Sequence, residues 1–291
     1  MTGVTQLTER FERERPHLRA VAYRMLGSLS EADDAVQEAW LRAARADTGG
    51  VDNLGAWLTT VVGRVCLNAL RARRRHPEES LEVRVPDPIL DPAGGTDPEH
   101  AAVLADSVGL ALMVVLETLT PNERLAFVLH DMFAVPFEEI APLIERSATA
   151  TRQLASRARR RVEGQAPAPD PDLARQRAVV DAFFAASRDG DFEALVSVLD
   201  PDVVLRSDAG GRSRFTFTMH GPRSVAEQAF TSGRLSPFVH PALINGAAGV
   251  VVAARGRALF VMAFTVKGGK VVAIDVLADP DRLAAVDLSR L

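Results

Sequence analysis

Apolar side chains recur at the spacing of an α-helix through the first 76 residues. The i, i+3, i+4, i+7 pattern that starts at residue 30 predicts an amphipathic helix capped by Ser30. Its predicted buried positions are Ala32, Ala35, Val36, Ala39, Trp40, Ala43 and Ala44. A second helix, from Leu54 to about Arg75, is predicted to bury Leu54, Trp57, Leu58, Val61, Val62, Val65 and Ala69. Residues 1–76 are therefore expected to be all-α, with a flexible glycine-containing loop at 47–53.

The polar positions of these two helices carry opposite charge. The first helix shows Asp34, Gln37 and Glu38 on its polar face. The second places Thr60, Arg64, Asn68, Arg71 and Arg75 at intervals of three and four, and five arginines but no carboxylate lie between Asn53 and Pro77. Solvated helix faces usually mix signs to gain i,i+4 pairs, so each face is a candidate surface for a charged partner.

Helix start signals organise residues 107–164. Thr120, Pro121 and Glu123 form a capping box with proline at the first helical position. Pro136 begins a short helix containing Ile140 and Leu143, and a tight turn at Glu145 and Arg146 leads to a helix capped by Ser147. A short helix, a tight turn and a capped helix predict a helix-turn-helix. The outward positions of its second helix are Thr149, Arg152, Gln153, Ser156, Arg157 and Arg160.

The pattern changes after residue 172. Two helical stretches, Leu173 to Arg188 and Phe192 to Leu199, precede segments with strand periodicity. The predicted strands are Val203 to Arg206, Arg214 to Met219, Gly249 to Arg255, Ala258 to Val266 and Lys270 to Leu277. Arg255–Gly256 and 267–269 are hairpin turn signals. Helices followed by an antiparallel meander predict an α+β domain.

Charge is unevenly distributed along the 291 residues, although the net charge is only −4. Residues 77–106 hold one basic and eight acidic side chains with five prolines, which predicts an extended acidic linker. The stretch 165–172, QAPAPDPD, predicts a stiff second linker. Cys66 is the single cysteine, so an internal disulfide is excluded, and no apolar run approaches the roughly 18 residues of a membrane span. We expect a cytoplasmic protein with no membrane contact.

The acid-free arginine segments indicate nucleic-acid binding. From Arg146 to Val162 there are six arginines and no carboxylate, on the second helix of the predicted helix-turn-helix. Residues near the start of that helix would read base edges, while Arg159, Arg160 and Arg161 at its far end would contact phosphate. The stripe on the earlier helix, with Trp57 and the preceding loop, suits unstacked single-stranded DNA, although a merely solvated face explains it about as well.

Four segments resemble the two DNA-binding regions of extracytoplasmic-function (ECF) sigma factors of the sigma-70 family. They read YRMLGS at 23–28, SEADDAVQEAWLRA at 30–43, NLGAWLTTVVGRVCLNALRARRR at 53–75, and TPNERLAFVLHDMFAVPFEEIAPLIERSATATRQLASRARRRV at 120–162. Residues 173–291 resemble the SnoaL-like, cone-shaped α+β domain fused to one group of them, the sigma factor J type. The resemblance implies a multidomain chain: region 2 at 1–76, the acidic linker at 77–106, region 4 at 107–164, the Pro-rich linker at 165–172 and the SnoaL-like domain at 173–291.

The resemblance also implies roles for residues. It implies that the β′ coiled coil of core RNA polymerase is bound by Asp33, Asp34, Gln37, Glu38 and Trp40. Contact with the −10 element falls to the 47–53 loop and to Asn53, Trp57, Arg64, Asn68, Arg71 and Arg75. Contact with the −35 element falls to Ser147, Thr149, Arg152, Gln153, Ser156, Arg157 and Arg160. Two altered motifs of the fused domain are expected to be regulatory: Asp208, Gly210, Gly211 and Arg212, and Asp279, Pro280, Asp281 and Arg282. We expect them to contact the sigma modules within the same chain.

The chain departs from the family pattern at several positions. Arg84 and Val85 replace the Trp-Leu of a Trp-Leu-Pro-Glu-Pro linker signature, and Arg64 stands where many members have Asn. Glu145 occupies a turn position that favours Gly, and Pro142 is expected to bend or shorten the first helix of the helix-turn-helix. The first two changes put the family's linker contact and promoter preference in doubt.

Two other functions remain alternatives. The C-terminal domain could be a cyclase or isomerase, with Asp208, His220, His240 and Asp275 as acid–base candidates, and a cavity with converging Asp and His would favour that hypothesis. A one-component helix-turn-helix repressor would not need Asp34 and Glu38. We predict no enzyme, no cofactor and no metal site, because the histidines lack a ligand-like spacing. The domain could still bind an unidentified small ligand.

Overall fold

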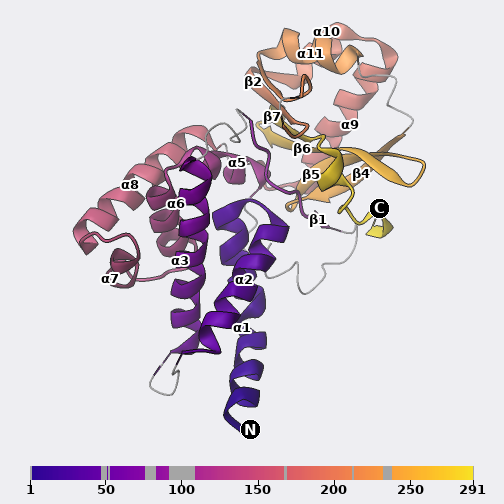
Figure 1. Cartoon of the computed structure of the whole chain (residues 1–291). Coiled ribbons are helices and arrows are strands. Elements are labelled where there is room, and N and C mark those ends of the chain that lie inside the picture. Colours follow the sequence, from indigo (N-terminus) through magenta and orange to yellow (C-terminus); the bar gives the residue numbers. More distant parts are fainter. Residues whose placement is uncertain are drawn as a thin grey trace. The chain divides into compact units, whose positions relative to one another are not determined.

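An all-α unit and a unit built on a seven-stranded sheet make up the chain (Figure 1). The computed structural model describes residues 2–46, 51, 53–75, 83–91, 109–166, 169–211, 213–231 and 238–290. Of these, 2–75 and 115–165 form the first unit, and 83–91, 109–114 and 166–290 form the second. Helix α5 (Leu110–Thr118) contributes residues to both. Within the described residues, we find no helix of the length and apolarity that a membrane span requires.

Three long helices begin the first unit: α1 (Thr2–Leu26), α2 (Leu29–Ala43) and α3 (Leu54–Arg75). Helix α1 is followed by Gly27, whose φ of +70° lets its N–H bond to the Tyr23 carbonyl at 2.8 Å. Ser28 then caps α2 through the Glu31 N–H, so the predicted cap at Ser30 is wrong by two residues. Ala44 follows the helix as an exposed residue, against the prediction that it is buried.

Helix α3 has the predicted bounds, but its buried face is rotated. Leu58, Val62 and Cys66 are buried, whereas Trp57, predicted to be buried, is only partly so, as are Val61 and Val65; Ala69 is exposed. The segment that contains Leu129 also packs on α3 and explains the rotation. It approaches so closely at Gly63 that a Cβ added there would lie 3.1 Å from the Leu129 side chain. Burial raises the pKa of the Cys66 thiol to about 12, as expected of a core cysteine.

The rest of this unit contains the predicted helix-turn-helix. Helix α6 (Pro121–Phe127) begins with the capping box. The Glu123 carboxylate accepts the Thr120 N–H at 3.0 Å, and the Thr120 hydroxyl accepts the Glu123 N–H at 3.3 Å. It continues as a π-helical turn, η2 (Val128–Met132).

Helix α7 (Phe137–Ile140) starts after Pro136 and passes into a 3-10 turn, η3 (Ala141–Leu143). Helix α8 (Ala148–Gln165) is the second helix of the motif.

The turn before α8 confirms two expectations. The α-helical hydrogen bonding of α7 stops just before Pro142, because proline has no N–H and its ring disfavours the preceding helical turn. Glu145 has φ +55°, the left-handed conformation that glycine adopts most easily. The Ser147 hydroxyl then accepts the Ala150 N–H at 3.2 Å and caps α8.

The second unit is an α+β fold with strand order β1-β4-β5-β6-β7-β2-β3. Its strands are β1 (Leu90–Asp91), β2 (Leu199–Asp208), β3 (Phe217–His220), β4 (Val239–Ile244), β5 (Ala247–Ala254), β6 (Arg257–Lys267) and β7 (Lys270–Leu277). Strands β4 to β7 form the antiparallel meander, but β2 joins β7 in parallel. The prediction of an antiparallel meander therefore did not include the parallel β2–β7 pair. It also missed β4, although Asn245–Gly246 between β4 and β5 is a hairpin signal.

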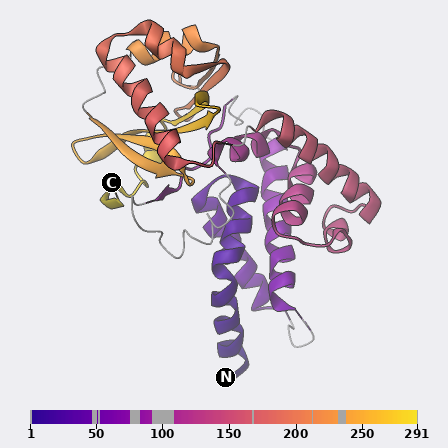
Figure 2. The ribbon, with the colours of Figure 1, turned by 180° about the vertical axis from the view of Figure 1, so that it is seen from behind.

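Helices α9 (Leu173–Asp189), α10 (Phe192–Val198) and α11 (Pro222–Thr231) cover one face of this sheet (Figure 2). Phe183, Phe184 and Phe264 meet edge to face with ring centroids 5.4 to 5.8 Å apart. Helix α12 (Pro280–Leu283) and the 3-10 turn η5 (Leu288–Arg290) follow β7. The core of the unit thus lies between the helices and the sheet.

Residues 83–91, from the segment predicted to be an extended acidic linker, are extended and belong to this unit. Val85 is fully buried, and Leu90 and Asp91 pair antiparallel with Ile244 and Leu243 at the sheet edge. The Asn245 side chain accepts the Ile89 N–H at 3.0 Å, and the Asn245 N–H bonds the Ile89 carbonyl at 2.8 Å. The linker therefore supplies an edge strand to the C-terminal sheet.

Replacing Glu145 with glycine should stabilise the first unit. Glycine adopts a positive φ without the Cβ clash, so E145G should raise the free energy of unfolding by about 0.5–1 kcal/mol in a urea titration followed by tryptophan fluorescence. The matched control is E139G in α7, which should lower it by a similar amount, about 0.5–1 kcal/mol. A loss of stability in E145G would contradict the conformational argument.

Candidate nucleic-acid interfaces

The outward face of α8 carries the predicted base-reading side chains. Thr149, Arg152, Gln153, Arg157 and Arg160 are exposed, Ser147 is exposed at the cap, and Ser156 is half-buried. The Arg152 guanidinium lies 5.2 Å from the Phe137 ring, which stacks on His130 with centroids 3.7 Å apart. A cation over an aromatic face is held in one orientation while it stays exposed. The structure therefore brings these side chains to one accessible, cationic surface.

Two arginines at the far end of α8 are engaged within the unit instead. Arg159 donates to the Asp131 carboxylate, with its Nε 2.8 Å from Oδ1. Arg161 lies 3.4 Å from Glu123. Burial opposes ionisation of Glu123, yet its pKa stays lowered by the Thr120 bonds and by Arg161 and Arg157. Arg159 and Arg161, expected to contact phosphate, therefore each have a carboxylate partner while 47% and 40% of their side chains stay exposed, and their contact with phosphate stays a prediction.

The polar stripe of α3 is only partly open. Arg64, Asn68 and Arg75 are exposed, whereas Arg71 donates to the Asn122 side chain of α6 at 3.1 Å. The Asn53 side chain accepts the Ala56 N–H at 3.1 Å and so begins α3. The glycine loop at 47–50 lies outside the described residues.

A buried contact joins the helices of this unit. Arg124 of α6 is 1% exposed, and its Nε and Nη2 donate to the Arg24 carbonyl of α1 at 3.1 and 3.0 Å. Its Nη1 lies 2.9 Å from Glu117. Sequence patterning missed Arg124, because nothing in its local sequence distinguishes a buried arginine from a solvated one.

The acidic face of α2 is exposed as predicted. Asp33 pairs with Arg19 of α1 at 2.6 Å, and Glu38 pairs with Arg42 on its own helix at 2.9 Å. Asp34 and Gln37 are exposed beside them. Trp40 is half-buried against Phe11, with ring centroids 5.0 Å apart, so only part of its ring faces solvent. The face thus carries the exposed Asp34 and Gln37 beside two carboxylates that are paired with arginines, and Trp40 packs against α1.

The two motifs predicted to be regulatory meet at the linker. Asp208 is fully buried at the end of β2, and its Oδ2 accepts the Val85 N–H at 3.0 Å and Arg282 Nη1 at 2.9 Å. Arg282 also donates from Nε to Asp87 at 2.6 Å and from Nη2 to the Val85 carbonyl at 2.6 Å. We call Asp208, Arg282, Val85 and Asp87 the linker clasp. One guanidinium thus joins the end of β2 and helix α12, which follows β7, to the linker.

The remaining motif residues shape the clasp. Asp279 caps α12 by accepting the N–H groups of Asp281 and Arg282 at 2.9 and 3.3 Å, with Pro280 at the first helical position. Gly210 and Gly211 have positive φ, and a Cβ on Gly210 would overlap the Asp279 carboxylate. Arg212 lies outside the described residues.

The four acid–base candidates do not converge on a cavity. Asp208 belongs to the clasp, and His220 and His240 are exposed on β3 and β4. Asp275 is buried beside Arg206, 3.0 Å away; burial raises its pKa, and Arg206 opposes the rise. The C-terminal unit contains a cavity of about 190 Å³, but none of these four residues lines it.

Known protein families match two segments of the all-α unit, and individual known proteins match nearly the whole chain. Residues 10–76 match the family "Sigma-70 region 2", and residues 109–162 match "Sigma-70, region 4". The chain is 41% identical to "ECF RNA polymerase sigma factor SigJ" of Mycobacterium tuberculosis, covering 96% of this chain and 93% of that protein. It is 35% identical to "Probable ECF RNA polymerase sigma factor SigI" of the same species, covering 92% of each. The crystal structure of SigJ superposes with a TM-score of 0.78 at 38% identity, over 97% of this chain and 99% of that one.

Acidification should destabilise the first unit through His17. His17 bonds Thr59 at 3.2 Å and packs edge-on against Phe133. Burial lowers its pKa, Glu14 opposes this and Arg24 adds to it. The unfolded chain therefore binds a proton first, and stability should fall as pH drops below about 6.5, the ordinary histidine pKa. H17Q should flatten this dependence in unfolding followed by tryptophan emission, while H240Q, in the other unit and outside these contacts, should not. Identical slopes for H17Q and the natural chain would contradict the assignment.

Proposed function

The chain belongs to the extracytoplasmic-function RNA polymerase sigma factors, which direct RNA polymerase to promoters, and on that premise we propose which of its surfaces do so. We assign 1–76 to region 2, 77–106 to the linker, 107–164 to region 4, 165–172 to a second linker and 173–291 to a regulatory SnoaL-like domain. The contacts of 83–91 support treating that part of the linker as functionally tied to the regulatory domain.

Helix α8 is proposed to read the −35 element. The observation that carries this assignment is an exposed, acid-free arginine face on the second helix of a helix-turn-helix, from Ser147 to Arg160. Arg152 and Arg157 would bond guanine edges in the major groove, and Arg160 would contact phosphate. Arg159 and Arg161, held by Asp131 and Glu123, would position the helix in its own unit.

Helix α3 is proposed to contact the −10 element. Arg64, Asn68 and Arg75 offer an exposed cationic and polar stripe, and Asn53 and Trp57 lie at its start, next to the loop that would accept an unstacked base. Arg71 is bonded to Asn122 of region 4. This bond uses one N–H group of the guanidinium, and we propose that its other N–H groups contact the DNA.

The acidic face of α2 is proposed to dock on core polymerase. Asp33, Asp34, Gln37 and Glu38 are exposed and would meet a basic surface on the β′ coiled coil, while Trp40 would contribute the edge of its ring. Opposite charges on two surfaces speed their encounter and fix their register.

The C-terminal domain is proposed to regulate the sigma regions through the linker clasp. Because the linker connects regions 2 and 4, a domain that fixes 83–91 limits the separations those regions can reach. The relatives of this chain are sigma factors, which are not enzymes, and we extend that to the C-terminal domain, whose acid–base candidates lie apart from its cavity.

Arginine identity on α8 should decide promoter binding. R152A should lose roughly 1–3 kcal/mol of binding to promoter duplex, about 5- to 160-fold in affinity, and lower run-off transcription with purified core polymerase in proportion. The matched control is R159A on the same helix, whose side chain is paired with Asp131 and whose loss should leave promoter affinity nearly unchanged. Equal losses in both variants would mean that α8 contributes only general positive charge.

Breaking the linker clasp should alter transcription without altering promoter contacts. R282Q leaves the buried Asp208 without its guanidinium partner, which should cost about 2–3 kcal/mol of local stability and speed proteolysis near 83–91. Run-off transcription should change relative to R257Q, a control at an exposed arginine of β6. If R282Q loosens the linker but transcribes like R257Q, the regulatory proposal fails.

A further inference from the structure

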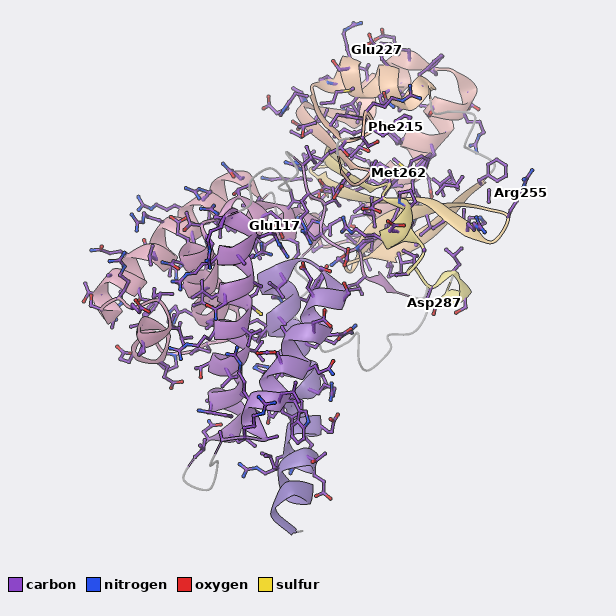
Figure 3. The ribbon with its side chains drawn as sticks, viewed as in Figure 1. Glu117, Phe215, Glu227, Arg255, Met262 and Asp287 are labelled. Atoms are coloured by element: carbon purple, nitrogen blue, oxygen red, sulfur yellow. The ribbon has the colours of Figure 1, made fainter. Side chains whose placement is uncertain are left out.

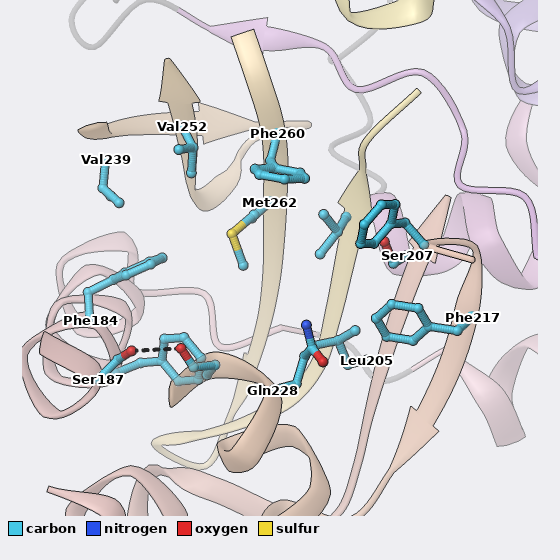
Figure 4. A pocket seen from close by; sticks show the side chains of 14 residues that line it. Phe184, Ser187, Leu205, Ser207, Phe217, Gln228, Val239, Val252, Phe260 and Met262 are labelled. Atoms are coloured by element: carbon cyan, nitrogen blue, oxygen red, sulfur yellow. Dashed lines mark hydrogen bonds between the residues drawn. The ribbon is translucent and has the colours of Figure 1, made fainter. Parts of the chain in front are cut away.

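The C-terminal unit encloses an apolar cavity between its helices and its sheet (Figure 4). Its volume is about 190 Å³. Figure 4 shows the side chains of Phe184, Leu205 and Met262, from α9, β2 and β6, pointing toward the same space. Protein interiors are packed as densely as organic crystals and leave few voids larger than a water molecule, so a space of this size is a feature to be explained.

The cavity reaches the surface. Phe215, labelled in Figure 3, lines the cavity. Its side chain is 54% exposed, so the ring forms part of the mouth. An aromatic side chain left half in water above an apolar space gains by covering an apolar occupant. The cavity is therefore accessible to small molecules.

The lining selects against charge. Five of its side chains are phenylalanines, and the described polar ones are Ser187, Ser207 and Gln228. None of the described lining residues is ionisable at neutral pH, so an ion would lose its hydration without gaining a counter-charge. The Ser187 hydroxyl donates to the Ala229 carbonyl at 3.1 Å, which leaves its lone pairs free to accept a hydrogen bond. The chemistry fits an uncharged ring with a hydroxyl or similar donor.

The volume limits the size of the occupant. An apolar cavity of about 150 Å³ holds benzene, so this one, at about 190 Å³, suits a compact aromatic or alicyclic molecule of roughly eight heavy atoms. Substituted phenols and small cyclic alcohols have this size and polarity.

The strand that lines the cavity also carries the linker clasp. Side chains alternate across a strand, and in β2 Leu205 and Ser207 face the cavity while Asp208 holds Val85 and Arg282. Arg206 pairs with Asp275 of β7, whose next residue, Val276, lines the cavity. A change in the packing of Leu205, Ser207 or Val276 therefore acts on the strands that hold the linker.

We propose that this cavity is a sensory site for a small uncharged aromatic or alicyclic alcohol, and that its occupation tightens the linker clasp. The binding site stands on the cavity alone, whereas the regulatory consequence rests on the proposed function of the clasp. A bound molecule fills space next to β2 and β7 and stabilises the folded unit by mass action, so the openings that release 83–91 become rarer.

Binding is tested by calorimetry on the full chain with 4-methylphenol as the probe and 4-methylbenzoate as its charged counterpart. We expect 4-methylphenol to bind with one site per chain, and 4-methylbenzoate at least tenfold more weakly. Failure of 4-methylphenol to bind, or equal binding of both probes, would overturn the assignment of an uncharged ligand.

Variants locate the probe. A229F fills part of the cavity from α11 and should weaken 4-methylphenol binding at least tenfold. F215A removes the ring at the mouth and should weaken it severalfold, whereas F230A, an equally exposed phenylalanine that does not line the cavity, should not. Because F215A and F230A change surface residues, this pair remains informative if A229F fails to fold. Equal affinities for F215A and F230A would place the probe elsewhere.

Coupling is tested by amide hydrogen exchange. Saturating 4-methylphenol should slow exchange of the Val85 and Ile89 N–H groups, which bond Asp208 and Asn245, and leave Thr151 of α8 unchanged. Binding without any change at Val85 and Ile89 would overturn the coupling and leave only a ligand site. These measurements use neither DNA nor polymerase, so they can fail while the promoter assays of R152A succeed, and the reverse.

Discussion

A guanidinium group withdrawn from water must find its partners inside the fold, and this requirement determines how the chain holds its own segments together. Arg282 meets it by bonding Asp208, Asp87 and the Val85 carbonyl, which fixes the linker to the C-terminal sheet. Arg124 meets it through the Arg24 carbonyl and a neighbouring carboxylate. In both units, the hydrogen bonds of one arginine therefore join segments that are distant in sequence.

The partners of each arginine also distinguish side chains that can bind another molecule from side chains that stabilise their own unit. Arg159 and Arg161 of α8 have carboxylate partners in their own unit, whereas Arg152 is oriented by an aromatic ring and still exposed. Counting arginines overstates the DNA-binding surface, since carboxylate partners in the same unit compete with DNA for some of them. The arginines that remain, Arg152, Arg157 and Arg160, run along the exposed face of α8, and its first turns are where a recognition helix meets base edges.

Strand β2 connects the two roles proposed for the C-terminal domain. Alternation gives it an apolar face toward the cavity and a charged end toward the linker. This arrangement needs no catalytic group, and it provides a physical route by which an apolar small molecule could influence promoter selection. A fold of this kind can thus act as a sensor with side chains that serve only packing and pairing.

Interactions between residues close in sequence made many local features of this chain predictable from its sequence. Helix bounds for α3, the Thr120 capping box, the glycine-like turn at Glu145 and the outward face of α8 follow from interactions within a few residues, and the structure bears them out. The roles of these faces on DNA and polymerase stay predictions. Tertiary structure alone decided which arginines are paired, that β2 joins β7 in parallel, and that the linker completes the sheet edge. Those features join residues up to 197 positions apart, as Arg282 and Val85 are, and no local pattern records which distant partner a buried charge will find.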